Sequence, residues 1–293
     1  MAAFINILLG GVFHAAVLFL VAAGLQIVFG VQKIVNLACG SFYALGAYFG
    51  VTTVTWALKA GLPPFLFLPV LIASGVVLAV IGPVIERLLR TVYDRDESFQ
   101  LLLTFALVLM FQDIMRYFWG ANPQQLGNLV MVYGKVGAGG VDLPVYNVLV
   151  IAGSIAIALI LGGFLQRTRY GRILRATAEN RAMTEALGVD VRRINVVVFT
   201  LGTVLGTVGG AFVVPTSAAS LDMAVELVVE AFAVVVIGGL GSMRGALAGA
   251  LVVGLMRAAA IALYAELELL SIYLVVILVL ILRPSGLFGK PAE

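Results

Sequence analysis

The sequence predicts an all-α fold, a polytopic transmembrane helical bundle of about eight or nine membrane elements that forms one domain over residues 1–293. Composition is the first observation: 62% of residues are hydrophobic and only 11% are charged, whereas a soluble domain carries roughly 25% charge. The second is that five stretches lack Asp, Glu, Lys and Arg, and each exceeds the roughly 20 apolar residues that span a bilayer. These stretches are 1–32, 34–58, 60–85, 143–166 and 194–221.

This composition excludes a cytosolic enzyme, a nucleic-acid-binding protein and a disulfide-stapled secreted domain. Cys39 and His14 are the only residues of their kinds, so an intrachain disulfide and a Cys- or His-rich metal site are excluded as well. Backbone groups in lipid must bond internally, and no alternating ten-residue strand pattern is present. The membrane elements are therefore predicted to be helices.

The first element covers residues 4–30, which lack the basic start of a cleavable signal peptide and exceed its apolar length, so we expect a retained span. His14 lies within it and is expected to be a hydrogen-bonded packing residue. The next elements are 34–58, 64–85 and 99–118. Residues 119–142 then form a loop rich in turn residues, including Asn122-Pro123 and the glycines at 137 and 139–140, long enough to meet a soluble partner.

After an element at 143–165, residues 166–193 hold seven arginines and three acids, which predicts a cytoplasmic loop. Within it a helical pattern runs from about 172 to 187, is interrupted at Asn180 and stops at Gly188. A solvated positive loop is one interpretation. The other is a docking helix that couples the chain to a cytoplasmic partner, with small residues allowing close approach; its candidate residues are Arg175, Glu179, Asn180, Glu185, Ala186 and Gly188.

The last elements are 194–215, 228–241, 245–263 and 268–283. Residues 228–241 are too short for a standard crossing, which leaves a half-helix or a re-entrant element as interpretations. If they count as a crossing, the N-terminus lies outside and the C-terminus inside. Fourteen of the 18 basic residues then face the cytoplasm, two (Lys59 and Lys135) lie outside, and two (Arg116 and Arg257) lie within spans.

Small residues recur at four-residue spacing, which allows helix backbones to approach closely in lipid. We expect these glycines to serve helix packing: Gly46 and Gly50, then Gly202, Gly206 and Gly210, then Gly241, Gly245 and Gly249.

Charged groups inside spans are costly and need a partner. Glu230 and Arg257 could lie at a similar depth, which predicts a structural salt bridge first and substrate contact second. No nucleophile–base pair, metal constellation or P-loop is present in the sequence, so active transport would need energy from another chain or from an ion gradient.

Four segments together resemble the branched-chain (hydrophobic) amino-acid ABC transporter permeases, of the LivH-like kind. They cover nearly the whole chain in the expected order. They are the signature at 29–48 (FGVQKIVNLACGSFYALGAY), the basic stretch at 171–190, the glycine-rich segment at 231–249 (AFAVVVIGGLGSMRGALAG) and the ending at 283–289 (RPSGLFG).

The resemblance implies a permease without enzymatic activity in the inner membrane of a bacterium. Its partners would be two cytoplasmic ATPase subunits that bind ATP and Mg, a second related permease and a periplasmic substrate-binding protein. This chain would bind no cofactor, no metal and no nucleic acid. The resemblance also implies broken helices around 36–43 and 230–241 that line the pathway, with Asn36, Ser41, Tyr43, Glu230, Gly238 and Gly239 as candidate pathway residues.

Many relatives carry His where this chain has Cys39, which leaves open the role of that position and the substrate. Urea and short-chain amide permeases have similar signatures and form one alternative. An ion-coupled secondary transporter and a membrane scaffold that does not transport are two more.

Overall fold

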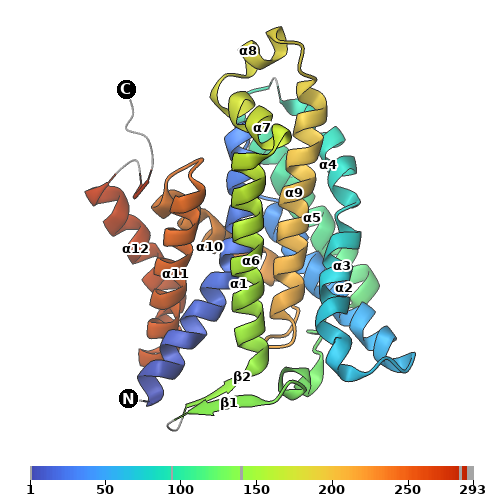
Figure 1. Cartoon of the computed structure of the whole chain (residues 1–293), viewed down its shortest axis with the longest axis vertical. Helices are drawn as coiled ribbons and strands as arrows, with labels where there is room; N and C mark the ends of the chain where they lie inside the picture. The colour runs from blue at the N-terminus through green and yellow to red at the C-terminus, as the bar shows by residue number, and fades with distance from the viewer. Residues whose placement is uncertain (1, 94, 139–140, 284–285, 289–293) are drawn as a thin grey trace.

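The computed structural model describes residues 2–93, 95–138, 141–283 and 286–288 (Figure 1). The glycines at 139–140, residues 284–285 of the C-terminal motif, and Gly289 and Lys290 lie outside the described residues. The helices form an elongated bundle. Helices α7 (Arg169–Glu179) and α8 (Arg181–Ala186) lie at one end, and a β-hairpin lies at the opposite end. We call these the α8 end and the hairpin end.

Most helices run along the bundle between these two ends (Figure 1). In the first half of the chain they are α1 (Ala2–Gln32), α2 (Cys39–Lys59), α3 (Phe67–Leu78), α4 (Ile81–Leu89) and α5 (Glu97–Trp119), with short 3₁₀ turns at Pro64–Leu66 and Arg90–Val92. In the second half they are α6 (Val145–Arg167), α9 (Val191–Val213), α10 (Met223–Gly238), α11 (Met243–Leu263) and α12 (Glu268–Leu282), with a 3₁₀ turn at Ala265–Leu267.

Six helical segments in the described part of the chain are long and apolar enough to cross a membrane. They are Ile5–Gln32, Pro64–Val92, Glu97–Trp119, Val145–Arg167, Val191–Val213 and Met243–Leu263. Helices α2, α10 and α12 pack in the same bundle, so each of the nine predicted membrane elements corresponds to helix. The prediction of a polytopic helical bundle is confirmed.

Two predicted elements differ from the structure in detail. The element at 34–58 begins only at Cys39, because Lys33 adopts φ 58° and ends α1, and the Asn36 side chain accepts a hydrogen bond from the Ala38 N–H. The element at 64–85 is divided between α3 and α4. The predicted interruption of the 172–187 pattern at Asn180 is confirmed, since α7 ends at Glu179 and α8 begins at Arg181.

The expectation of a broken helix at 230–241 is wrong. Helix α10 is continuous from Met223 to Gly238 and ends in a turn at Gly239, where φ is 94°. Its 16 residues span about 24 Å, short of the roughly 30 Å of a hydrocarbon core. Its buried residues lie along its whole length, so the surrounding helices, rather than its own apolar length, hold it in the bundle.

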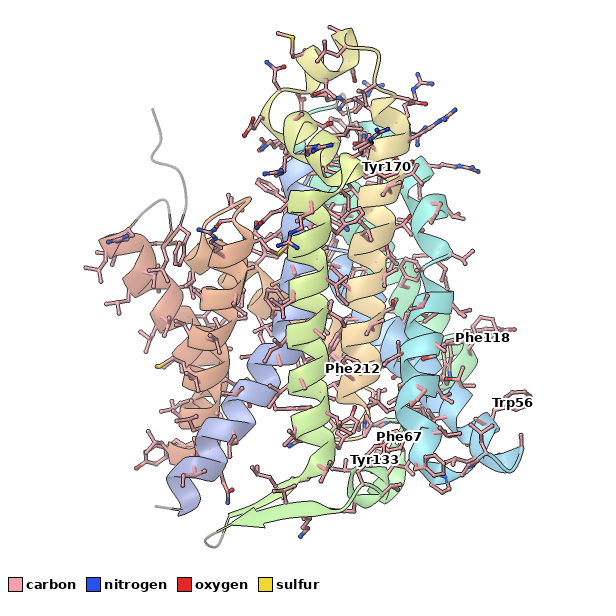
Figure 2. All side chains as sticks on the ribbon, viewed as in Figure 1. Trp56, Phe67, Phe118, Tyr133, Tyr170 and Phe212 are labelled. Carbon is pink, nitrogen blue, oxygen red and sulfur yellow. The ribbon has the colours of Figure 1, made fainter. Side chains whose placement is uncertain are left out.

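The loop at 119–142 folds into a 3₁₀ turn (Gly127–Met131) and an antiparallel hairpin of β1 (Lys135–Ala138) and β2 (Val141–Pro144). The rings of Tyr133 and Phe67 lie 5.1 Å apart, and the Tyr133 hydroxyl donates a hydrogen bond to the Phe65 carbonyl (Figure 2). Burial raises the pKa of this hydroxyl above its usual range. Gln124 and Ala219 form a β-bridge, so the loop is fixed to the α9–α10 connection at the hairpin end.

Helices α1 and α9 form the centre of the bundle. In their most apolar windows 78% and 61% of the residues are buried, against 17% in α6. Because lipid gives helices no hydrophobic reason to associate, close backbone packing must stabilise this centre. The α1 and α9 backbones meet at Gly24, where an added Cβ would lie 2.9 Å from the Gly202 carbonyl oxygen.

Most of the predicted packing glycines lie at such contacts. Added Cβ atoms at Gly46 and Gly210 would collide with backbone atoms of Thr207 and Tyr43, which joins α2 to α9. In the same way Gly245 and Gly249 meet the α10 backbone at Gly238 and Val234.

Three other glycines differ in role or tightness of contact. Gly50 meets the Leu71 side chain at 3.0 Å, and Gly206 makes only ordinary contact with Phe42 at 3.4 Å. The packing role expected for Gly241 is wrong: it lies in the α10–α11 turn with φ 80°, and nothing lies within 4 Å of its Cβ position.

Candidate functional site

A polar cavity of about 220 Å³ lies between α1, α2, the α9–α10 connection, α10 and α11. Because Ala219 of that connection pairs with Gln124, the cavity lies toward the hairpin end. Its lining combines an apolar wall with charged and hydroxyl side chains: Phe13, His14, Tyr43, Val213, Thr216, Ser217, Ala218, Ser220, Met223, Glu226, Leu227, Glu230 and Arg257.

A charged cluster forms the inner wall of this cavity. Arg257 Nη1 donates to Glu230 Oε1 over 2.7 Å, and His14 Nε2 lies 2.8 Å from Glu230 Oε2. The predicted Glu230–Arg257 salt bridge is therefore present, and His14 is hydrogen-bonded as expected. Glu230 is 2% exposed, so its carboxylate depends on these partners rather than on water.

Glu268, which pairs with the other Nη atom of Arg257, is a member of the cluster that the sequence reasoning misses. It begins α12 next to a short turn that brings this helix back toward the middle of α11. The sequence contains one signal for this role: Glu268 begins an apolar element and lies only 11 positions after the intramembrane Arg257. Arg257 thus balances two carboxylates, which fixes α10 and α12 to α11.

His14 Nε2 lies 2.8 Å both from Glu230 Oε2 and from Arg257 Nη1. An imidazole nitrogen can donate or accept, but the same nitrogen cannot do both at once. One of the two contacts is therefore unsatisfied in any protonation state, so the cluster is close-packed but imperfectly paired.

Several polar groups of the cavity have no partner in the described part of the chain: the hydroxyls of Ser217 and Ser220, and the side chains of Tyr43 and Glu226. Tyr43 is 5% exposed, and its hydroxyl forms no hydrogen bond with a described residue although Glu230 and Arg257 line the same cavity. Glu226 lies one turn before Glu230 on α10, is exposed, and forms no ion pair with a described residue. The Tyr43 and Glu226 side chains are available to a ligand.

Of the six predicted pathway residues, the structure brings Tyr43 and Glu230 to the cavity. The other four lie elsewhere. The Asn36 side chain accepts from the Ala38 N–H in the turn before α2, the Ser41 hydroxyl is buried without a partner among the described residues, and Gly238 packs against Gly245. The Gly239 carbonyl accepts a hydrogen bond from Gln26 at 3.0 Å.

The α8 end carries the basic stretch, and Figure 2 shows side-chain nitrogen atoms gathered there, with Tyr170 at the base of this region. Thr168 caps α7, and Asn180 ends α7 and caps α8 by accepting from the Met183 N–H at 2.9 Å. Gly188 has φ 83° and ends the segment, as predicted. All six candidate coupling residues are exposed: Arg175, Glu179, Asn180, Glu185, Ala186 and Gly188.

Large apolar side chains are also exposed at this tip. Met183 is 59% exposed and Leu187 is 77% exposed, between the ion pairs Arg181–Glu185 and Arg193–Asp190. The side chains that hold α7 and α8 in place are buried; they are Leu174, Thr177 and Thr184. An apolar tip with a charged rim is typical of a protein-docking surface.

The α10–α11 turn lies near α7 and is held by Gln26 of α1. Gln26 of α1 accepts from the Gly241 N–H at 2.6 Å and donates to the Gly239 carbonyl, which holds the α10–α11 turn. Gln26, Gly241 and Met243 line a small pocket with Arg175 and Ala178 of α7. Residues of α7 and of the turn that follows α10 therefore line the same pocket.

The sequence matches a family model described as "Branched-chain amino acid transport system / permease component" over residues 7–282. The chain is 26% identical to the high-affinity branched-chain amino acid transport system permease protein BraD of Pseudomonas aeruginosa, over 93% of this chain and 91% of the relative. It is 27% identical to the probable permease LivH of Methanocaldococcus jannaschii, over 85% and 78% of the two chains. It is 25% identical to LivH of Escherichia coli, over 98% and 96%.

Proposed function

Because the chain belongs to the branched-chain amino acid transport permease family, we propose that it conducts branched-chain or other hydrophobic amino acids through the membrane in an ATP-driven importer. The permeases it is similar to carry this substrate class in their names. The observation that carries the proposal is the exposed α7–α8 tip, in which all six candidate coupling residues are free to meet another protein.

In this proposal two ATPase subunits bind ATP and Mg in the cytoplasm, and this chain binds neither. A second related permease completes the membrane unit, and a periplasmic binding protein delivers substrate at the hairpin end. The membrane is the bacterial inner membrane. The basic α8 end faces the cytoplasm, as the positive-inside rule requires.

The proposed mechanism is alternating access. ATP-driven closure of the ATPases moves α7 and α8. Because α7 and the α10–α11 turn line one pocket, and Gln26 of α1 holds that turn, the movement reaches the helix that carries Glu226 and Glu230 at the cavity. The chain itself forms no covalent intermediate: it positions substrate and opens to one side at a time.

Uptake by the assembled importer in proteoliposomes tests this function. With the ATPases, the second permease and the binding protein present, wild type should accumulate radiolabelled leucine only when ATP is supplied. Glu179→Lys and Gly188→Trp should assemble but lose ATP-coupled uptake, because both alter the docking surface. A Lys59→Gln variant, changed at the hairpin end, is the matched control. Undiminished uptake by both tip variants would refute the docking role.

The charged cluster of His14, Glu230, Arg257 and Glu268, in which Glu230 is buried, favours one competing function, an ion-coupled secondary transporter, since such proteins place ionisable groups inside the membrane. Uptake by this chain alone, driven by a proton or sodium gradient, would support that function instead. Copurification of ATPase subunits in stoichiometric amounts supports the importer.

A further inference from the structure

We propose that the cavity at the hairpin end binds the primary ammonium group of the transported amino acid, so that this chain selects its cargo in addition to any selection by a binding protein. The inference rests on the proposed function, because it takes an amino acid as the cargo. It assigns the ammonium contact to Glu226 and Tyr43.

Charge is the first argument. The cavity lining contains two carboxylates, Glu226 and Glu230, and one permanent cation, Arg257. Arg257 is already held by Glu230 and by Glu268. Glu226 is therefore the lining carboxylate that lacks a counter-ion in the described part of the chain. A cavity with an excess of negative charge between apolar walls attracts cations and repels anions.

The second and independent argument is the Tyr43 hydroxyl. Tyr43 is 5% exposed as a residue, and its hydroxyl lines the cavity and forms no hydrogen bond in the part of the chain that the structure describes. This hydroxyl opens onto the cavity, so a bound ligand can reach it. An ammonium group carries three N–H donors and no acceptor, so it suits a site that offers a carboxylate and a hydroxyl oxygen.

Size and polarity complete the site. The volume of about 220 Å³ lies below the roughly 300–1,000 Å³ of pockets for drug-sized ligands, so the cavity suits a small molecule. Phe13, Met223 and Leu227 supply an apolar wall for an aliphatic side chain. Urea and simple amides have no ammonium group and would leave Glu226 unpaired, so the cavity should discriminate against them.

Binding to the purified full-length chain in lipid nanodiscs, without the binding protein, tests the site directly. Four ligands of similar shape are compared by ligand-detected NMR: leucine, 3-methylbutylamine, 4-methylpentanoate and 4-methylpentanamide. We expect leucine and the amine to bind and to compete with each other, and the acid and the amide to bind at least about tenfold more weakly. One charge-assisted hydrogen bond accounts for a factor of this size.

Two variants assign the contact. Glu226→Gln should weaken both amines at least about tenfold, and Tyr43→Phe should weaken them by a smaller factor, since it removes a neutral partner. Glu266→Gln, at an exposed carboxylate in the turn before α12, is the matched control and should leave binding unchanged. Tyr43→Phe keeps the ring and its packing. If Glu226→Gln failed to fold, Tyr43→Phe would therefore still test the ammonium contact.

Three outcomes overturn the proposal: equal binding of leucine and 4-methylpentanoate, unchanged binding in Glu226→Gln, or no binding of either amine. A failure of the proposed transport function would give a different result. If amine binding follows the expected pattern but the assembled wild-type importer does not accumulate leucine with ATP, the ammonium site stands and the proposed transport does not.

Discussion

Glu230 is a buried charged residue whose partners come from two other helices. The residue is 2% exposed in a helix within the bundle, and an unpaired charge there would be very costly. His14 and Arg257 offset that cost from two different helices, α1 and α11. The residue therefore fixes three helices to one another, and its partners depend on it in return.

We expect Glu230→Gln to destabilise the chain by about 3 kcal/mol, the cost of removing one partner from a buried ion pair. Glutamine keeps the shape but leaves Arg257 with Glu268 as its remaining carboxylate. The thermal unfolding midpoint in detergent, followed by size-exclusion chromatography, measures the effect. Glu266→Gln removes an exposed carboxylate and should not change the midpoint. If Glu230→Gln assembled and transported like wild type, both the structural and the substrate role of the pair would be excluded.

Gly210 is the tightest of the packing glycines, because an added Cβ would overlap the Tyr43 carbonyl oxygen. We expect Gly210→Ala to separate α2 from α9 and to cost about 1–3 kcal/mol, as overpacked sites do. Gly153 in α6 is the matched control, since nothing lies within 4 Å of its Cβ position. Gly153→Ala should leave stability unchanged or raise it slightly, because alanine favours helix. Equal unfolding midpoints for the two variants would show that the close approach has no energetic role.

At the scale of elements, the α7–α8 pair depends on its caps. Helix α8 has only six residues, and Thr184 is the one that is buried, so little besides the Asn180 cap keeps it folded. Asn180→Ala should cost α8 about 1 kcal/mol and leave the unfolding midpoint of the bundle unchanged.

Limited trypsin digestion of inverted vesicles detects this local change, because opening of α8 exposes the bond after Arg181. We expect cleavage there to become about fivefold faster in Asn180→Ala, the factor that corresponds to 1 kcal/mol. Glu179→Gln alters the neighbouring residue without touching the cap and should be cleaved at the wild-type rate. An unchanged rate in Asn180→Ala would mean that the cap does not stabilise α8.

The presence of each helix can be predicted from the sequence. A charge-free apolar run that is long enough to span a bilayer is stable in lipid mainly as a helix. Helix boundaries depend on local features that hydropathy does not show. The predicted start of α2 is misplaced because Lys33 takes a left-handed conformation that hydropathy alone does not reveal. The Asn36 side chain then accepts a hydrogen bond from the Ala38 N–H in the turn before α2. The predicted element at 228–241 begins too late, because Glu226 interrupts the apolar run. Helix α10 begins earlier, at Met223, because neighbouring helices bury its first residues as well.

The candidate site can be predicted only in part, for a related reason. Intramembrane charges indicate that each needs a partner, which identifies the Glu230–Arg257 pair. The charges do not predict which helices are neighbours in the bundle. His14 and Glu268 complete the cluster from residues 216 positions before and 38 positions after Glu230, and only the tertiary fold brings them together. The cavity itself depends on the α9–α10 connection, whose position the sequence does not predict.

At the scale of the whole molecule, α1 joins the two functional ends. Toward the hairpin end its His14 contacts the charged cluster of the cavity. About 18 Å further along the helix, at 1.5 Å per residue, its Gln26 holds the α10–α11 turn beside α7. Helix α10 also reaches both regions. In the proposed mechanism these two helices are therefore the connection through which docking at the α8 end changes the cavity toward the hairpin end.

The crossing order of the whole chain gives the last prediction. If α10 crosses the membrane, the α8 tip and the α10–α11 turn face the cytoplasm, and the hairpin and the turn before α12 face outward. Four exposed positions report on this arrangement: Met183, Leu240, Met131 and Tyr264. The single native cysteine, Cys39, is buried and should not react with an impermeant maleimide, so each new cysteine can be read alone.

Met183→Cys and Leu240→Cys should be labelled only in inside-out vesicles, and Met131→Cys and Tyr264→Cys only in right-side-out vesicles. The expectation follows from the arginines near α7 and α8, which by the positive-inside rule favour a cytoplasmic position for that end. A re-entrant α10 would reverse the result for Leu240→Cys and Tyr264→Cys while leaving Met183→Cys and Met131→Cys unchanged. The two pairs therefore separate an error in overall orientation from an error in the crossing of α10. Only a full crossing brings the turn held by Gln26 to the same side as the docking helices, which the proposed coupling requires.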